Sequence, residues 1–154
     1  MNWTFREGDL DCDDVRALLA RHFAEMTAGT PLSACHVMPA DALSDPEIRF
    51  FTLRDDDGTL LGCGTFKWLA QDHGEIKSMR TADTALGRGV GGAVLDHLVD
   101  MARASGMTRL SLETGNSETF AAANHLYQRE GFVRCGPFGG YRPTNFTTFY
   151  TRQI

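Results

Sequence analysis

The chain has 154 residues, of which 42% are hydrophobic and 23% charged, and its formal net charge is −5. These values are typical of a soluble globular protein and predict one domain, residues 1–154, that can bury a core of its own. The arginines are scattered and form no basic block, which argues against nucleic acid as a partner.

The N-terminal part predicts an edge strand followed by a helix. Trp3 and Phe5 alternate with polar neighbours over residues 2–7, as in a short strand. The acidic stretch 11–14 suits a helix start, and the helix is expected to reach about Thr27. Its apolar residues recur at helical spacing and predict a buried stripe: Val15, Leu18, Leu19, Phe23 and Met26.

Residues 31–47 have no clear pattern. Gly29-Thr30-Pro31 ends the first helix. A second short helix around Pro39 to Leu43 is one interpretation of this segment. In many small enzymes a segment of this kind covers a substrate site, so residues 31–47 are a candidate for that position.

A meander of three strands comes next. Residues 50–54 and 60–69 are predicted strands, joined by an Asp-Gly turn at 55–58 that is typical of a hairpin. After a turn at 71–74, residues 75–81 form the third strand. Strict alternation would place residues 75, 77, 79 and 81 on one face of that strand.

A glycine-rich loop, Gly87-Arg88-Gly89-Val90-Gly91-Gly92, separates the third strand from a strongly apolar helix. Glycines at a helix entrance let main-chain amides approach a ligand closely. The first amides of a helix have no acceptor within it, and the helix dipole adds partial positive charge there. The loop is therefore suited to a phosphate or pyrophosphate, which predicts a phosphorylated cofactor.

The helix after the loop is predicted to end at Gly106, a residue that favours helix C-termini. Its buried stripe is predicted to contain Val90, Ala93, Val94, His97, Leu98 and Met101. Because His97 lies on this apolar face, we interpret it as a packed core histidine.

The C-terminal third alternates strands with one more helix. Residues 108–114 predict a half-buried strand, residues 117–130 a helix, and residues 132–133 and 145–151 two further strands. The order as a whole is mixed α and β. It differs from a doubly wound fold, which begins with a β-α-β unit and has its glycines near the N-terminus.

The cysteines and the apolar segments predict a cytoplasmic protein. The four cysteines, at 12, 35, 63 and 135, form no C-x-x-C pair and no zinc spacing, so free thiols and no metal are expected. The first residues lack the pattern of a signal peptide. No apolar segment approaches the length of a membrane span, so no membrane partner is expected.

Two common phosphate-binding motifs do not fit the loop. A P-loop closes its glycine run with Lys-Ser or Lys-Thr, whereas Gly92 is followed by Ala93 and Val94. A dinucleotide-binding loop reads G-x-G-x-x-G, and its acidic ribose anchor would fall near residues 107–109, where no acid stands.

Three features together resemble the GNAT superfamily of N-acetyltransferases, which use acetyl-CoA. They are a strand that ends just before the glycine loop, the apolar helix that the loop opens, and Leu126-Tyr127-x-x-x-Gly131-Phe132 about thirty residues later. The family loop is usually written Gln/Arg-x-x-Gly-x-Gly/Ala. In the preferred register Leu86 takes its first position, and in the alternative register, 88–93, Arg88 does. Phe120 stands where the family often has Asn.

The resemblance implies a central mixed, mostly antiparallel sheet of about six to seven strands flanked by about four helices. It implies transfer of an acetyl group from acetyl-CoA to a primary amine of a small metabolite or amino acid, without a metal. The alternative function is a noncatalytic acyl-CoA-binding sensor on the same fold. Pairing through edge strands is common in the family, so a homodimer is a further expectation.

The resemblance also implies which residues bind the cofactor. They are Met79, Arg80, Thr81, Gly87, Arg88, Gly89, Val90, Gly91, Gly92 and Asn124. Met79 and Thr81 would offer main-chain groups to the pantetheine arm, and residues 87–92 would wrap the pyrophosphate. The Arg88 side chain could add a charge-assisted contact. Asn124 lies near the position of the family asparagine.

Acetyl transfer to an amine needs a base for the amine and an acid for the leaving thiolate. Tyr127 matches the family tyrosine close to the cofactor sulfur and is the candidate acid. Glu75 is the candidate base, directly or through water, because it begins the strand that ends at the cofactor. Glu113 on the neighbouring strand is its rival, with His73 and His36 as further candidates.

The acceptor pocket is harder to predict than the cofactor site. Phe138 and Tyr141, in the loop 137–141, are expected to form part of it. Glu113 is expected to border the same pocket from the end of its strand. The resemblance does not fix which amine binds there.

Overall fold

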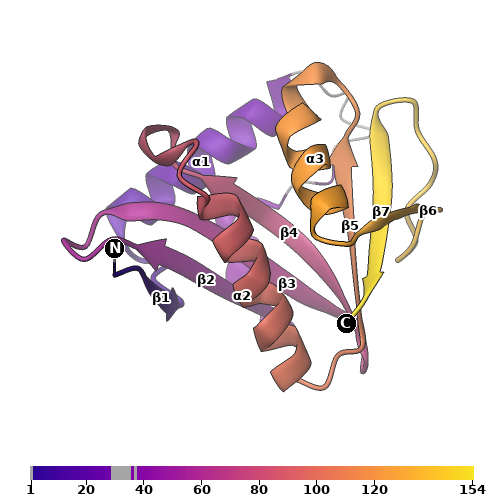
Figure 1. The fold of residues 1–154 in the computed structure, drawn as a ribbon, viewed down its shortest axis with the longest axis horizontal. Coiled ribbons are helices and arrows are strands. Elements are labelled where there is room, and N and C mark those ends of the chain that lie inside the picture. Colours follow the sequence, from indigo (N-terminus) through magenta and orange to yellow (C-terminus); the bar gives the residue numbers. More distant parts are fainter. Residues whose placement is uncertain (1, 29–35, 37) are drawn as a thin grey trace.

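In the part of the chain that the structure describes, seven strands form one sheet, and helices cover both of its faces (Figure 1). The computed structural model describes residues 2–28, 36 and 38–154. In spatial order the strands are β1 (Thr4–Glu7), β2 (Ile48–Arg54), β3 (Leu60–Ala70), β4 (His73–Thr81), β5 (Arg109–Gly115), β7 (Thr147–Gln153) and β6 (Val133–Cys135). All neighbours pair antiparallel except β4 and β5, which are parallel. The predicted mixed, mostly antiparallel sheet is confirmed.

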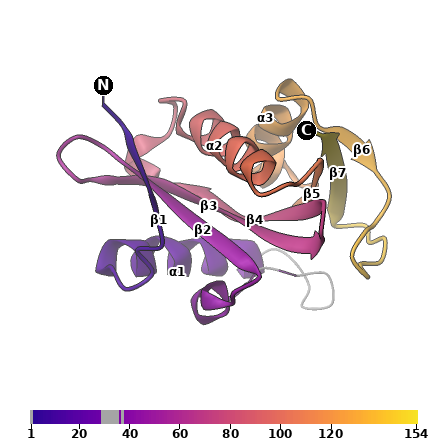
Figure 2. The same cartoon turned by 90° about the horizontal axis from the view of Figure 1, so that it is seen from below.

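The helices divide between the two faces of the sheet (Figure 2). α1 (Asp13–Ala28) and the 3-10 helix η2 (Ala40–Ser44) lie on one face, and α2 (Val90–Ala104) and α3 (Ala121–Arg129) lie on the other. The short 3-10 helices η3 (Asp83–Ala85) and η4 (Glu118–Phe120) precede α2 and α3. With three α-helices in the described ranges, the expected number of about four is slightly too high. The reason is that the predicted second helix is only a 3-10 turn.

Each face of the sheet has its own apolar cluster. The larger cluster lies under α2 and α3 and the smaller one under α1 and η2. Gly64 of β3 shows how closely α2 packs: a Cβ added there would lie 2.6 Å from Val94 Cγ1 and 2.9 Å from Leu98 Cδ1. The glycine therefore lets the helix approach the sheet. No helix in the described part of the chain has both the length and the hydrophobicity for crossing a membrane.

The predicted apolar stripes need two corrections. In α1, His22 is buried at 7% exposure while Phe23 is 39% exposed, so the helix is rotated from the predicted stripe. In α2 the buried residues include Leu95, Val99 and Ala102, which the predicted stripe omitted. Three residues of the predicted stripe are only partly buried: Ala93, His97 and Met101. The sequence shows only where apolar residues recur, whereas the packing of each helix on its sheet decides which edge of that stripe is covered.

His97 is packed as predicted, with its ring 3.9 Å from the Phe5 ring in a stacked arrangement. Phe51 meets the same imidazole edge-on at 4.9 Å. Burial lowers the pKa of His97, with the nearby Arg49 charge as a smaller cause. The three described cysteines are free thiols, and Cys35 lies outside the described residues.

Candidate active site

β4 and β5 separate in the middle of the sheet. They pair only from His73 to Ile76 and from Arg109 to Leu112, and beyond these positions neither strand pairs with the other. A cavity of about 140 Å³ lies at this opening. The main-chain groups of both strands that face the opening are free of ladder partners across it, so they are available to a ligand.

A β-bulge in β4 lies at the same place. Cys63 of β3 pairs with Arg80 and Thr65 pairs with Lys77, so Ser78 and Met79 together stand opposite a single residue. Ser78 has a φ of 49°, which is a rare left-handed conformation for a residue with a side chain. Bulges of this kind re-aim side chains and are common beside active sites.

The bulge overturns the expectation that residues 75, 77, 79 and 81 share one face. Glu75, Lys77 and Arg80 reach side chains on the α1 side, where Arg80 Nη2 donates to Glu25 Oε2 at 2.7 Å. Met79 instead packs on the cluster under α2. One extra residue in the strand shifts the alternation, and the sequence pattern does not reveal it.

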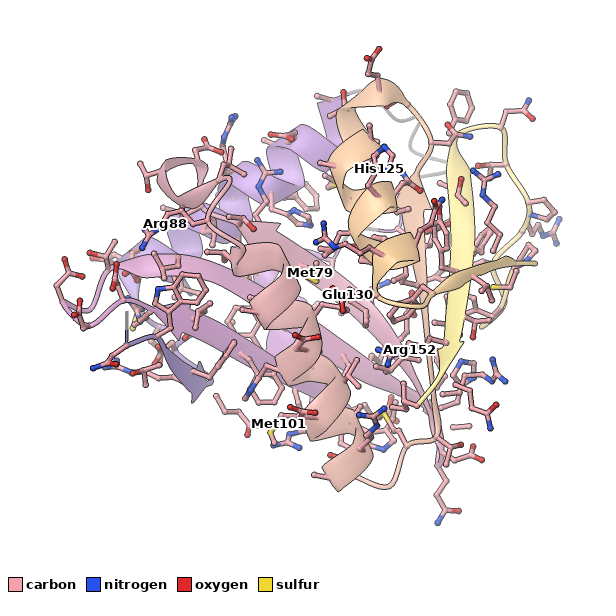
Figure 3. All side chains as sticks on the ribbon, in the orientation of Figure 1. Met79, Arg88, Met101, His125, Glu130 and Arg152 are labelled. Atoms are coloured by element: carbon pink, nitrogen blue, oxygen red, sulfur yellow. The ribbon has the colours of Figure 1, made fainter. Side chains whose placement is uncertain are left out.

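The cavity is lined from both faces of the sheet. His22 and Met26 of α1 border it from one side, and Ala123 and Tyr127 of α3 border it from the other. Met79 also lines it, and Figure 3 shows this residue in the region between α2 and α3. The opening between β4 and β5 therefore connects the two faces, and two molecules entering from opposite faces can meet there.

The glycine loop lies at the N-terminus of α2. Gly87 and Gly89 have φ values of 77° and 82°, and a Cβ added at either would meet nothing within 4 Å. Gly89 is the N-cap of α2, without a side-chain capping bond. The first main-chain bond of the helix is donated by Ala93 to the Gly89 carbonyl, at 3.1 Å. The loop thus presents main-chain amides at the positive end of the dipole with open space above them.

Residues around the loop place it beside the end of β4. A Cβ added at Gly91 would lie 3.1 Å from Leu126 Cδ2 and 3.8 Å from Thr81 Oγ1. Thr81 therefore adjoins the loop, and its contact with the cofactor stays a prediction. Leu86 is 64% exposed, so it fills no core position.

The two predicted cofactor-binding arginines are held by acidic partners. Arg88 Nη2 contacts Asp55 Oδ2 at 3.3 Å, and its guanidinium lies 5.8 Å from the Trp3 ring (Figure 3). Arg80 is paired with Glu25 on the α1 side, so only its main chain can face the opening. A phosphate contact by the Arg88 side chain remains a prediction and would compete with Asp55.

Tyr127 is a predicted site residue that is buried in the cavity wall. It is 7% exposed and packs against the rings of Phe132 and Tyr150, with centroids 6.1 and 6.0 Å away. Burial raises the pKa of Tyr127 to about 12, and the neighbouring Tyr150 adds to the shift. The hydroxyl is therefore protonated at neutral pH and can act as a proton donor.

Asn124 holds α3 to the sheet. Its Nδ2 donates to the carbonyls of Gly115 and Phe120, and its Oδ1 accepts from the Tyr150 hydroxyl at 2.7 Å. Phe120 packs so tightly on Gly115 that any Cβ there would lie 2.2 Å from its ring. Phe120 thus lines the cavity as an apolar wall, and a cofactor contact by Asn124 remains a prediction.

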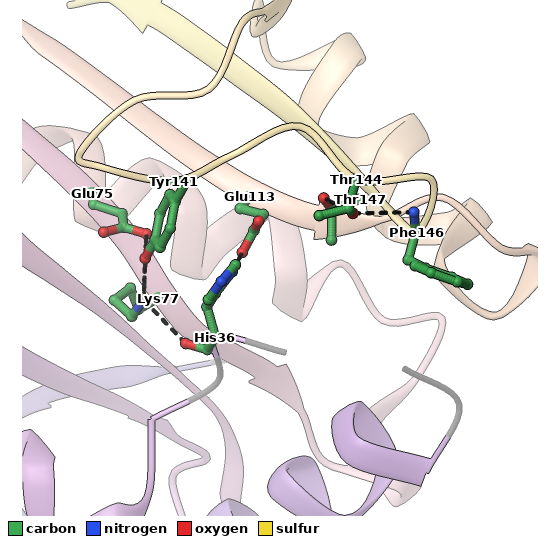
Figure 4. A network of polar contacts seen from close by, with 8 residues as sticks. All are labelled: His36, Glu75, Lys77, Glu113, Tyr141, Thr144, Phe146 and Thr147. Atoms are coloured by element: carbon green, nitrogen blue, oxygen red, sulfur yellow. Dashed lines mark hydrogen bonds and ion pairs between the residues drawn. The ribbon is translucent and has the colours of Figure 1, made fainter. Parts of the chain in front are cut away.

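On the α1 side, Glu75 belongs to a polar cluster with Lys77 and Tyr141 (Figure 4). The Tyr141 hydroxyl donates to Glu75 Oε2 at 2.7 Å, and Lys77 Nζ donates to the same oxygen at 3.3 Å and to the Tyr141 hydroxyl at 2.8 Å. Burial, the charge of Glu75 and the bond to it raise the pKa of Tyr141 far above its usual value. Tyr141 comes from the β6–β7 loop, so this cluster ties that loop to β4.

His36 and Glu113 form a second polar pair beside that cluster (Figure 4). His36 Nδ1 lies 2.6 Å from Glu113 Oε1, and the two residues are 77 positions apart in the chain. Glu113 Oε2 is buried without a hydrogen-bond partner in the described structure. His36 also stacks on the Tyr141 ring, with centroids 4.5 Å apart. Both residues line the cavity.

Tyr141 does not line the cavity itself, and two other sequence candidates, Phe138 and His73, also lie outside its lining. Phe138 packs against the rings of Tyr141 and Phe149, at 5.5 and 5.7 Å, and so supports the loop. His73 Nε2 lies 2.7 Å from the Ser111 hydroxyl at the paired end of β4. Burial, with a smaller effect of the Arg109 charge, lowers the pKa of His73.

His22 and Lys77 are site residues that the sequence did not single out. His22 lines the cavity, and burial together with the Arg80 charge lowers its pKa to about 4. The signal in the sequence that could have indicated His22 was its position directly before Phe23, which was predicted to lie on the buried stripe of the helix. Lys77 was expected only to share a strand face with Glu75, and its side chain proves to be just 11% exposed.

The family model described as Acetyltransferase (GNAT) family matches residues 14–132. A protein of Bacillus subtilis (strain 168), named uncharacterized N-acetyltransferase YsnE, is 39% identical over 146 residues, which cover 95% of this chain and 96% of that one. Both matches include the glycine loop and Tyr127, the residues on which the sequence resemblance depends.

Two solved structures share the fold. N-acetylglutamate synthase from Neisseria gonorrhoeae, complexed with coenzyme A and N-acetyl-glutamate, aligns with a TM-score of 0.74 and 23% identity over 99% of this chain and 35% of that one. A GNAT family acetyltransferase from Elizabethkingia anophelis with acetyl-CoA bound aligns with a TM-score of 0.66 and 21% identity over 99% of both chains. The fold, the family model and the sequence relative agree, and the chain belongs to the GNAT family of acetyltransferases.

Proposed function

We propose that this enzyme transfers the acetyl group of acetyl-CoA to the primary amine of a small metabolite or amino acid. The observation that carries the proposal is the cavity at the opening between β4 and β5, which is lined from both faces of the sheet. The glycine loop lies near one end of this opening and the polar cluster at the other. A thioester and an amine bound on opposite faces would meet between the strands.

The residues of the loop fit a diphosphate. Gly87 and Gly89 have positive φ values and open space at Cβ, so the main chain is bare on that side. Amides at the start of α2 would donate to phosphate oxygens, and the helix dipole favours negative charge there. The unpaired edge of β4 at Met79 and Thr81 would bond the amide groups of the pantetheine arm. Coenzyme A or acetyl-CoA in the two structural neighbours supports this assignment.

On the thiol side, Tyr127 is proposed as the general acid. Its hydroxyl, which is neutral because its pKa is about 12, would donate a proton to the departing sulfur as negative charge develops there. Main-chain amides of the bulged segment at Ser78 and Met79 would face the negative charge that develops on the carbonyl oxygen. Their rigid placement by the bulge would make such stabilisation effective.

On the amine side, the cavity offers two carboxylates, Glu75 and Glu113, as candidate proton acceptors. An alkylamine is largely protonated at neutral pH, because its pKa is near ~10.4, and it must lose a proton before it attacks. The small size of the cavity, about 140 Å³, and the Tyr141 loop beside it favour a compact acceptor. N-acetyl-glutamate in one neighbour is consistent with an amino acid among the candidates.

Thiol release from acetyl-CoA, measured with a panel of small primary amines and amino acids, tests the proposal. We expect turnover with at least one compact amine, together with an acetylated product whose mass is that of the amine plus one acetyl group. Coenzyme A that binds without any turnover across the panel would overturn the proposed reaction. Calorimetry with coenzyme A in parallel separates failed binding from failed transfer.

A further inference from the structure

Glu75 and Glu113, the two carboxylates in the cavity, have different surroundings. Glu75 Oε2 already accepts from the Tyr141 hydroxyl at 2.7 Å and from the Lys77 ammonium at 3.3 Å. A lone pair engaged by a cation is a poor proton acceptor. Glu113 meets a different donor, the His36 ring, and its second oxygen is buried without any partner among the described residues.

The contact between His36 and Glu113 indicates that the Nδ1 atom of the imidazole carries a hydrogen. An ionised carboxylate only accepts hydrogen bonds, so at 2.6 Å the hydrogen must lie on His36 Nδ1. In the neutral ring the lone pair is then on Nε2. The Tyr141 ring stacks on the imidazole at 4.5 Å and holds its plane. Nε2 makes no hydrogen bond within the described ranges.

Glu113 Oε2 provides the second, independent sign of a missing ligand. The Glu113 side chain is only 9% exposed, and this oxygen has no donor among the described residues. A buried carboxylate oxygen without a donor is costly, so such an atom is expected to meet a ligand. An ammonium group supplies the donors that this oxygen lacks.

We propose that His36, held by Glu113, takes the proton that the acceptor amine must lose. This proposal rests on the proposed acetyl transfer and assigns the base within it. The N–H bond of the ammonium breaks, and its proton moves to His36 Nε2. The freed nitrogen lone pair forms the C–N bond, and the C–S bond breaks with its electron pair on sulfur. The nitrogen's second proton replaces the one that Tyr127 gives to the sulfur, and His36 returns its proton to solvent.

Charged groups around His36 favour this role. Glu113 of β5 lies against the ring and stabilises an imidazolium once it forms. The Lys77 ammonium contacts the His36 carbonyl at 3.3 Å, and its charge is offset by Glu75 on the same strand. Tyr141 faces the ring as a neutral phenol because its pKa is raised. Across the cavity, His22 of α1 has a pKa lowered to about 4 and is neutral at physiological pH.

His36→Asn tests the base directly, because the Asn amide still donates to Glu113 but has no counterpart of Nε2. With acetyl-CoA and the fastest amine of the panel, kcat/KM should fall about 100-fold, and the acid limb of the wild-type pH profile should disappear. The affinity for coenzyme A should be unchanged by calorimetry. His125→Asn is the matched control, since His125 is exposed on the outer side of α3 (Figure 3).

Two rescue experiments separate a base from a structural residue. Added imidazole should restore part of the activity of His36→Asn. An alkoxyamine acceptor, which is unprotonated at neutral pH, should lose much less rate in this variant than an alkylamine does. A purely structural histidine would show neither effect.

Glu113→Gln tests the orientation of the ring. The Gln amide can donate to His36 Nδ1, so the hydrogen should move to Nε2 and the rate should fall about as far as in His36→Asn. Nitrogen NMR of the ring should show the Nδ1–H tautomer in the wild type and the Nε2–H tautomer in the variant. If the His36→Asn variant turned over as fast as the wild type and kept the acid limb of the pH profile, the role of His36 as base would be overturned, but the proposed function would stand. A wild type inactive on every amine would remove the proposed function itself.

Discussion

The two ends of the opening between β4 and β5 are built from different materials. The glycine loop is made of consecutive residues, and what it offers a ligand is main chain at a helix N-terminus. The polar end is made of side chains from segments far apart in the sequence: Lys77 and His36 are 41 positions apart, and Glu75 and Tyr141 are 66. The first end can be predicted from a local motif, whereas the second exists only after the chain has folded.

The comparison also separates what each end can do. Main-chain amides carry no titratable group, so the loop should bind its ligand equally well over a wide pH range. The polar end contains titratable groups whose protonation changes with pH, and it should therefore set the pH dependence of both rate and stability. Substitutions at each end of the opening between β4 and β5 test this division.

The largest expected effect is loss of coenzyme A binding in Gly89→Asp. The new side chain would place bulk and negative charge against the diphosphate, at a φ of 82° that favours glycine. We expect binding to weaken about 1,000-fold in calorimetry, or about 4 kcal/mol. Gly106→Asp is a matched control at the other end of α2, with a φ of 88° and open space at Cβ. Equal affinities in the two variants would refute the loop assignment.

Tyr127→Phe should lower kcat about 100-fold while leaving the affinity for coenzyme A nearly unchanged. The reason is that the ring still fills its place between Phe132 and Tyr150, while the acid is lost. Because the pKa of Tyr127 is near 12, the wild type should show no alkaline loss of activity from this residue below about pH 11. A variant as fast as the wild type would remove Tyr127 as the acid.

Glu75→Gln should have a smaller effect, about tenfold on kcat/KM, because it loosens Tyr141 and Lys77 rather than removing the base. The acid limb of the pH profile should remain. If Glu75→Gln lost the acid limb of the pH profile and His36→Asn kept it, Glu75 rather than His36 would be the base. Steady-state rates of both variants across the same pH series decide between the two.

The last expected effect is on stability in acid rather than on binding or activity. Burial holds the pKa of His22 at about 4 in the folded protein, below the 6.5 of the free side chain. Between these values the unfolded chain binds the additional proton, so stability should fall as pH falls, by at most about 1.4 kcal/mol per pH unit. The free energy of unfolding, measured with urea at a series of pH values, should change less steeply with pH in His22→Leu than in the wild type. Identical slopes would mean that His22 is not the titrating group.

Most of the fold could be predicted from the sequence. The meander, the loop and the two helices that come after it have local signals: the Asp-Gly turn at Asp57, the glycines, and the apolar repeats. The bulge at Ser78 could not be predicted, because it depends on the register against β3 rather than on any residue type. The bulge decides which face Met79 and Thr81 occupy, and thus how the cofactor residues are arranged.

The candidate site could be predicted only where its residues belong to a local sequence motif. Tyr127 belongs to a local motif and lines the cavity. The pairing of His36 with Glu113, and the burial of His22, result from packing across the opening of the sheet. No spacing in the sequence brings together residues that are 77 positions apart.

A crystal structure with coenzyme A bound tests the central claim most directly. The account predicts the diphosphate on the amides of residues 87–92 and the thiol in the opening beyond Ile76 and Leu112, beside the Tyr127 hydroxyl. A coenzyme bound to another part of the surface, or a thiol that stays outside the opening between β4 and β5, would contradict it.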